Sequence, residues 1–121
     1  MSISLSIPGD PQHLAVLRAT AAAVAARARL TIDQLEDVRL AVEEAAATLL
    51  AGQPASIELT MDPGNLPLTV TVAANPTGPV DLDPEGFSWT ILSAMSDEFK
   101  VEQSDGRVTM TMRFATVAAT A

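Results

Sequence analysis

The 121-residue sequence contains 15 acidic and 7 basic side chains, which give a formal net charge of −8. This length predicts one domain, residues 1–121, in which residues 115–121 are expected to be a frayed tail. The negative charge disfavours nucleic-acid binding, because that affinity depends on lysine and arginine side chains that neutralise phosphates. With no cysteine and one histidine, the sequence excludes a disulfide framework and predicts no metal site built from thiolates or histidines.

The chain carries no signal for targeting or membrane insertion. Its first ten residues, MSISLSIPGD, lack the basic and apolar regions of a signal peptide. No apolar run approaches the ~20 residues that a membrane-spanning helix needs. We therefore expect a cytoplasmic protein that does not contact a membrane.

A strand and a helix are predicted first. Apolar residues alternate with serines over residues 3–7, which is the pattern of a half-buried strand. Asp10 is then a suitable N-cap, and Pro11 suits the first position of a helix. The alanine-rich stretch that follows favours a helix continuing to about Arg29.

The longest predicted element is a helix from Thr31 to Gly52. Thr31 and Gln34 fit a capping box, and Gly52 is a typical helix stop. Apolar residues recur every three or four positions and form one stripe, made of Ile32, Leu35, Val38, Val42, Ala46 and Leu49. Glu44 and Thr48 lie on a second line beside it. They could serve a site, or they could be the solvated edge of an amphipathic helix, which their spacing alone favours.

The second half of the chain predicts four strands and a third helix. Alternating patterns over residues 56–61 and 66–72 indicate a hairpin, and a loop rich in proline and glycine follows at residues 75–86. A helical pattern begins at Phe87, and two strands follow it, the second over residues 108–114. This order predicts an α/β two-layer sandwich, in which a mainly antiparallel sheet of about five strands carries three helices on one face.

Two stretches resemble a known family. The run LTIDQLEDVRLAVEEAAATLL is similar to the second helix of RsbW-type anti-sigma factors, which are small serine-protein kinases with the GHKL (Bergerat) ATPase fold. The run EGFSWTILSAMSDEFKV is similar to their last helix and the strand after it, especially in the actinobacterial branch. The resemblance covers roughly residues 3–114 and implies a histidine-kinase-like ATPase fold.

The resemblance also assigns roles to motif positions in the central helix. Active members of the family carry E-x-x-x-N there, in which the glutamate orients or activates the attacking group and the asparagine holds magnesium. Glu44 fits the glutamate, whereas Thr48 stands where the asparagine would be. A hydroxyl can ligate magnesium, so this change alone does not decide whether the site works.

Two glycine-rich motifs of the family are changed more severely. The family's D-x-G-x-G motif recognises adenine through its aspartate, and here Ala74 stands at that position with Pro76 and Gly78 after it. Alanine cannot accept the hydrogen bond, and proline lacks a backbone N–H. The later G-x-G motif has become Gly86-Phe87-Ser88, in which the first glycine survives. The resemblance therefore implies that Glu44 is a vestigial general base and that Thr48, Ala74, Gly78 and Gly86 no longer bind a nucleotide.

These changes favour a regulator that binds proteins and needs no cofactor. We expect an anti-sigma factor that sequesters an alternative sigma factor of the sigma-F or sigma-B kind, in stress or development. It would be a homodimer, as its relatives are, and a STAS-type anti-anti-sigma factor would release the sigma factor by competition. Glu36, Asp37 and Glu43 could bind the basic surface of the sigma factor, or they could be plain solvated surface.

Two other functions stay open. The first is an active serine kinase that uses ATP and magnesium to phosphorylate the STAS protein. Glu44 favours it weakly, and Thr48, Ala74, Pro76 and Ser88 speak against it. The second is a stand-alone scaffold domain with an unrelated partner, since a fold does not fix a function.

Overall fold

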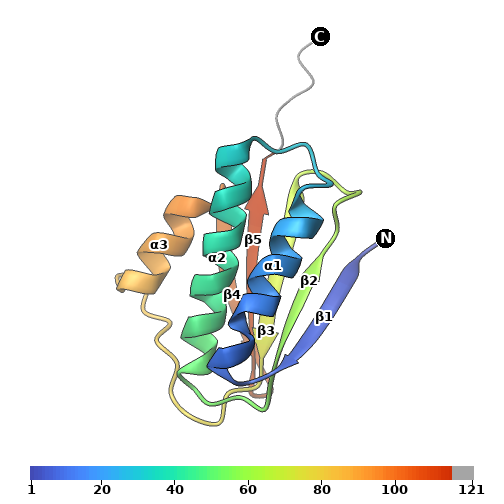
Figure 1. Cartoon of the computed structure of the whole chain (residues 1–121). Helices are drawn as coiled ribbons and strands as arrows, with labels where there is room; N and C mark the ends of the chain where they lie inside the picture. Colours follow the sequence, from blue (N-terminus) through green and yellow to red (C-terminus); the bar gives the residue numbers. More distant parts are fainter. Residues whose placement is uncertain (116–121) are drawn as a thin grey trace.

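The computed structural model describes residues 1–115 of the chain (Figure 1). Its elements are β1 (Ile3–Pro8), a 3-10 turn (Pro11–His13), α1 (Leu14–Ala25), α2 (Ile32–Leu50), β2 (Ser56–Met61), β3 (Leu68–Ala74), α3 (Phe87–Met95), β4 (Glu98–Ser104) and β5 (Arg107–Phe114). Their order is the predicted one. None of the helices in residues 1–115 has the length and apolar character needed to cross a bilayer.

Within these residues the strands form one antiparallel sheet in the order β1-β2-β3-β5-β4. The α-helices cover one face of the sheet, with α2 between α1 and α3 (Figure 1). Alternate strand residues face the helices and are buried, and they include Ile57, Leu59, Val70, Val72, Met110 and Met112. The predicted two-layer sandwich with helices on one face is therefore confirmed.

The start of α2 is tied to the end of the sheet. Thr31 and Gln34 form the predicted capping box, in which Gln34 Oε1 accepts a hydrogen bond from the Thr31 N–H at 2.9 Å. The amide nitrogen of the same Gln34 side chain donates to the carbonyl oxygen of Ala115 at 2.6 Å. The Ala115 N–H donates to Asp97 Oδ2, also at 2.6 Å. Ala115, the first residue of the predicted frayed tail, is thus held at both backbone groups, and the rest of that tail lies outside the described residues.

The structure corrects two predicted boundaries and one residue that was predicted to be buried. The α-helix α1 ends at Ala25 instead of near Arg29, because the backbone tightens into turns that bring Leu30 against the core before the Thr31 cap. Ile32 does not belong to the buried stripe of α2, since as the first helical residue it is 81% exposed. Strand β3 begins at Leu68, two residues later than predicted, and Leu66 is exposed.

Candidate functional site

Glu44, Thr48 and Ser88 meet where α3 packs against α2. The Thr48 hydroxyl donates a hydrogen bond to the backbone carbonyl oxygen of Glu44 at 2.9 Å and lies 3.4 Å from Oε2 of the Glu44 carboxylate. Ser88, the second residue of α3, donates its hydroxyl proton to the same Oε2 at 3.2 Å. Thr48 is buried, and Glu44 and Ser88 are half-buried. One carboxylate oxygen is thus shared by hydroxyl groups from two helices.

This geometry places Glu44 and Thr48 on the side of α2 that faces α3, rather than on a solvated edge. Ser88 enters the cluster as the hydrogen-bond partner of Glu44. From the sequence, Ser88 was identified only as a residue that replaces the second glycine of the family's G-x-G motif. The pairing could not be found from spacing, because it depends on how α3 lies across α2, and the sequence gives no periodic signal that links the two helices.

Ala74 ends β3 inside the core. It is 2% exposed and is paired across the sheet with Ile57 on β2 and Val108 on β5. Its methyl group offers no hydrogen-bond acceptor. Ala74 is therefore a packing residue, surrounded by apolar neighbours from both adjacent strands.

The segment after β3 is fastened to the end of α2. The backbone N–H groups of Thr77 and Gly78 both donate to the carbonyl oxygen of Gly52, at 2.8 and 2.9 Å. A Cβ atom on Gly52 would lie 2.6 Å from Pro76 Cβ and 2.6 Å from Val80 Cγ2, so that only glycine allows this approach. At Gly78 the nearest atom to such a Cβ is 3.7 Å away. The close contact is thus made at Gly52, and the Thr77 and Gly78 N–H groups are already used within the chain.

Gly86 is the N-cap of α3 and makes no side-chain capping contact. Its N–H donates to the Asp83 carbonyl oxygen at 2.8 Å, and an added Cβ would lie 3.0 Å from that oxygen. The glycine retained from the family motif therefore allows a tight turn just before Ser88. This turn fixes the start of α3, and with it the direction of the Ser88 side chain.

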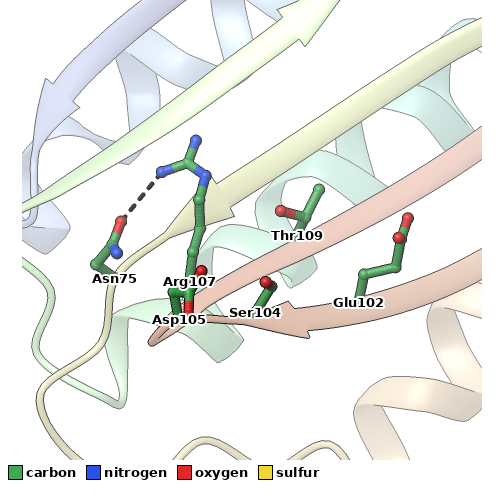
Figure 2. Close-up of a pocket in the computed structure, with 6 residues that line it drawn as sticks. All are labelled: Asn75, Glu102, Ser104, Asp105, Arg107 and Thr109. Atoms are coloured by element: carbon green, nitrogen blue, oxygen red, sulfur yellow. Dashed lines mark hydrogen bonds between the residues drawn. The ribbon is translucent and has the colours of Figure 1, made fainter.

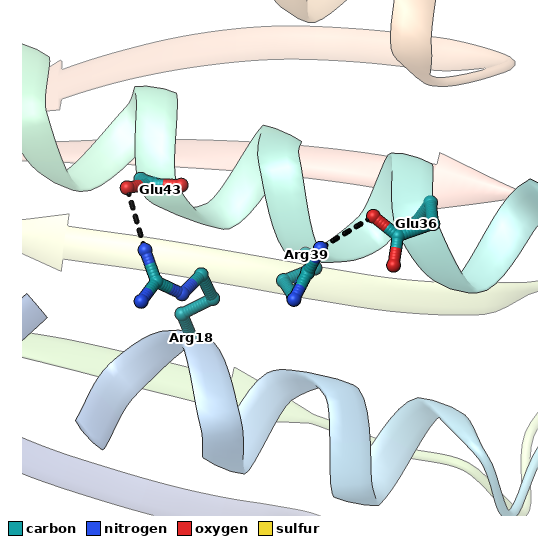
Figure 3. Close-up of polar contacts among 4 residues, drawn as sticks. All are labelled: Arg18, Glu36, Arg39 and Glu43. Atoms are coloured by element: carbon teal, nitrogen blue, oxygen red, sulfur yellow. Dashed lines mark hydrogen bonds and ion pairs between the residues drawn. The ribbon is translucent and has the colours of Figure 1, made fainter. Parts of the chain in front are cut away.

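Two of the three acidic residues predicted to bind a partner form ion pairs within the helical layer (Figure 3). Glu43 on α2 contacts Arg18 on α1 at 2.8 Å, and Glu36 contacts Arg39 on the same helix at 2.6 Å. Asp37 is half-buried. The arginines offset much of the negative charge that the sequence alone suggested for this surface.

A polar hollow lies elsewhere, beside the turn between β4 and β5 (Figure 2). It has a volume of about 460 Å³ and is lined by Asn75, Glu102, Ser104, Asp105, Arg107 and Thr109. The guanidinium of Arg107 donates to Asn75 Oδ1 at 3.1 Å and to Glu58 Oε1 at 2.9 Å. None of Glu44, Thr48 and Ser88 lines this hollow. Across residues 1–115, no three acidic or histidine side chains gather in a way that could hold a metal ion.

Comparison with known proteins gives matches over most of the chain. The sequence model of the family described as histidine kinase-like ATPase domain matches residues 7–114. Anti-sigma-F factor RsbW from two strains of Mycobacterium tuberculosis, CDC 1551 / Oshkosh and ATCC 25618 / H37Rv, is 30% identical over 108 residues. Each match covers 88% of this chain, and the chain spans 64% of the length of these relatives.

A solved structure shares the fold. The RsbU and RsbW domains of Rv1364c from Mycobacterium tuberculosis align with a TM-score of 0.75 over 95% of this chain and 32% of that chain, at 12% identity. At this identity the likeness concerns the fold. Together with the sequence matches it confirms the predicted resemblance to RsbW-type anti-sigma factors. Because the family model covers most of the chain, the protein belongs to the family of histidine kinase-like ATPase domains.

Proposed function

We propose that this chain is an anti-sigma factor that sequesters an alternative sigma factor through protein contacts and does so without ATP. Its similarity to relatives named Anti-sigma-F factor RsbW supports the sigma-binding part, although the chain spans 64% of their length. The observation that carries the ATP-independent part is the hydrogen bond from Ser88 to Glu44. It engages Oε2 of the carboxylate that an active kinase would use on the attacking group.

The residues present do not fit ATP and magnesium. Ala74 offers a buried methyl group where the family has a base-recognising carboxylate. A hydrogen bond to a charged group contributes about 1.5–3 kcal/mol, and that contribution is missing. The N–H groups of Thr77 and Gly78 are bonded to Gly52 and are not free for phosphate oxygens. We therefore assign no nucleotide step to Glu44 or Thr48.

The sigma factor is held, in this proposal, by the acidic outer side of α2. The net charge of −8 favours encounter with a basic, DNA-facing surface. Lysines or arginines of the sigma factor would bind Glu36, Asp37 and Glu43, and they would exchange with Arg39 and Arg18 at the two ion pairs. These ion pairs are partly exposed, so replacing one cation with another at each carboxylate should change the free energy little.

The proposal also covers how the sigma factor is released and how the protein assembles. Because phosphoryl transfer is absent, a STAS-type anti-anti-sigma factor frees the sigma factor by competing for the same surface. The protein acts in the cytoplasm as a homodimer, in stress or development.

Calorimetry with ATP and magnesium tests the ATP-independent part. We expect no binding heat up to about 1 mM ATP, the weak end of specific affinities. Micromolar binding would instead support the alternative, an active kinase acting on the STAS protein. Transfer of labelled phosphate to a STAS protein is the second readout, and we expect none.

Titration with purified sigma factors of the sigma-F and sigma-B kind tests the sigma-binding part. We expect one of them to bind with equal affinity in the presence and absence of ATP. Failure of all of them to bind would favour the scaffold hypothesis. The double variant Glu36→Gln/Glu43→Gln should weaken binding and lower its salt dependence, whereas Glu98→Gln on the exposed edge of β4 serves as the matched control.

A further inference from the structure

The polar hollow at the end of the β4–β5 hairpin lies on the face of the sheet that the helices leave uncovered. Val108 on β5 is buried in the core, so its neighbours Arg107 and Thr109 point to the opposite face. Their direct partners on β4 are Ser104 and Glu102. These four outward residues all line the hollow of about 460 Å³. The hollow is therefore separate from the contact between α2 and α3.

Arg107 forms one wall of the hollow and is held in place. Its guanidinium donates to Glu58 Oε1 on β2 at 2.9 Å and to Asn75 Oδ1 at 3.1 Å (Figure 2). Because β5 pairs with β3 and β3 with β2, the side chain spans β3. Ala73, opposite Glu58 on β3, is only 3% exposed although it faces away from the helices, as expected where a long side chain crosses over it. The wall is thus ordered before a ligand arrives, which lowers the entropy lost on binding.

A tight turn places a further polar group at the hollow. Asp105 and Gly106 connect β4 to β5 with φ angles of 51° and 78°, both in the left-handed region that suits a two-residue hairpin turn. Asp105 lines the hollow together with the strand residues. A second hollow of about 330 Å³ shares Ser104, Asp105 and Arg107 with the first. Hydrogen-bonding groups therefore extend around the end of the hairpin.

The charges at the hollow offset one another. Arg107 is 2.9 Å from Glu58, and Glu102 is 3.6 Å from Lys100. An anion in the hollow would meet the carboxylates of Glu102 and Asp105, and a cation would meet the guanidinium of Arg107. All six lining residues are polar, so an apolar ligand would gain little there. The lining therefore favours a neutral ligand that binds through hydrogen bonds.

We propose that this hollow binds a small neutral sugar or polyol. Every hydroxyl group of such a ligand can both donate and accept a hydrogen bond. It can accept from Arg107 and donate to the carboxylates of Glu102 and Asp105, and the Ser104 and Thr109 hydroxyls can act in either direction. This site lies away from the acidic side of α2, and the inference does not depend on sigma binding or on ATP.

Amide NMR spectra of the full chain, recorded during titration with glucose and with maltose, test the proposal. We expect saturable shifts at Asn75 and at residues 102–109, with dissociation constants of about 1 mM, because the hollow offers no aromatic ring for stacking. Sugars such as sucrose are generally excluded from protein surfaces, so a local and saturable response indicates a site. Absence of saturable shifts with both sugars, up to about 10 mM, or shifts centred elsewhere, would overturn the proposal.

A pair of valine variants tests the contact itself. Thr109→Val removes one hydroxyl from the hollow and keeps the β-branched shape, so it should weaken binding by about threefold or more. Thr111→Val is the matched control, since Thr111 is the next outward residue of the same strand and does not line the hollow. It should bind the sugars like the unmodified chain. Unchanged binding by Thr109→Val would refute the assigned contact.

A series of charged sugars tests the neutral ligand class on the unmodified chain and does not depend on whether a variant folds. Glucosamine adds one positive charge to glucose, and glucose 6-phosphate adds negative charge. Because the hollow presents charges of both signs, neither compound should bind more than about threefold more tightly than glucose. A stronger preference for either one would assign the hollow to charged ligands and overturn the proposal, whatever the sigma-binding assays give.

Discussion

Ser88 and Glu44 are 44 residues apart in the sequence, and a hydrogen bond of 3.2 Å joins them across the contact between α3 and α2. Thr48 approaches the same carboxylate oxygen from one turn further along α2. The contact has a structural effect as well as a chemical one. It fixes the first turn of a nine-residue helix whose N-cap, Gly86, supplies no side-chain hydrogen bond.

Removal of this hydrogen bond should lower the free energy of unfolding. Ser88→Ala leaves Oε2 of the half-buried Glu44 without its Ser88 partner, and we expect a loss of about 1 kcal/mol. The measurement is urea denaturation followed by circular dichroism. Ser93→Ala, at an exposed position of the same helix, is the control and should stay within about 0.5 kcal/mol of the unmodified chain. Equal stabilities of the two variants would mean that the Ser88 contact is not formed in solution.

Restoration of the family's aspartate should be harmful in this chain. Ala74→Asp puts a carboxylate between Ile57 and Val108 at a position that is 2% exposed, and we expect a loss of about 1–3 kcal/mol. The neighbouring Asn75→Asp, at an exposed position, is the control and should change little. Thermal unfolding with and without ATP gives the readout. A rise in the midpoint of Ala74→Asp on addition of ATP would show that a nucleotide pocket persists, against the proposed function.

Replacement by alanine of the two glycines at the loop contact, Gly52 and Gly78, should change the free energy of unfolding by different amounts. Gly52→Ala brings a methyl group within 2.6 Å of Pro76 and Val80, so overpacking should cost about 1–3 kcal/mol. Gly78→Ala meets nothing closer than 3.7 Å, and its effect should be small. Faster hydrogen exchange at Thr77 and Gly78 in the Gly52→Ala variant would show that the loop has left the end of α2. A Gly52→Ala variant as stable as the unmodified chain would contradict this contact.

The Arg18–Glu43 ion pair should contribute little to stability. Both side chains are more than a third exposed, and pairs of this kind are worth about 0.2–1 kcal/mol at low salt. A double-mutant cycle with Arg18→Ala and Glu43→Ala, measured by denaturation at low and high salt, gives the coupling energy. A coupling well above 1 kcal/mol would make the exchange of arginines proposed for sigma binding unfavourable.

The sequence was most informative where local chemistry decides the structure. The Thr31–Gln34 capping box, the alternation in the strands and the order of elements all follow from spacing and residue type, and each was predicted. The end of α1 was not, because alanine propensity over residues 26–29 is overridden by the packing of Leu30 against the core. Propensity is a weak prior where tertiary contacts compete with it.

The contacts between helices in the candidate site also could not be predicted from the sequence. Glu44 and Thr48 were found because they lie one turn apart on a single helix. Ser88 could be recognised as their partner only after α3 had been placed against α2. The ion pair of Glu43 with Arg18 was likewise invisible, since it joins two helices whose relative register depends on the whole core.

The Gln34 side chain uses both ends of one amide, accepting from the cap of α2 and donating to Ala115 after the last strand. If either the N-cap of α2 or Ala115 moves away, the other therefore loses its hydrogen bond to Gln34. Fraying of the first turn of α2 and release of Ala115 from the end of β5 should therefore be coupled, so that the helical layer and the sheet loosen together at this end of the molecule.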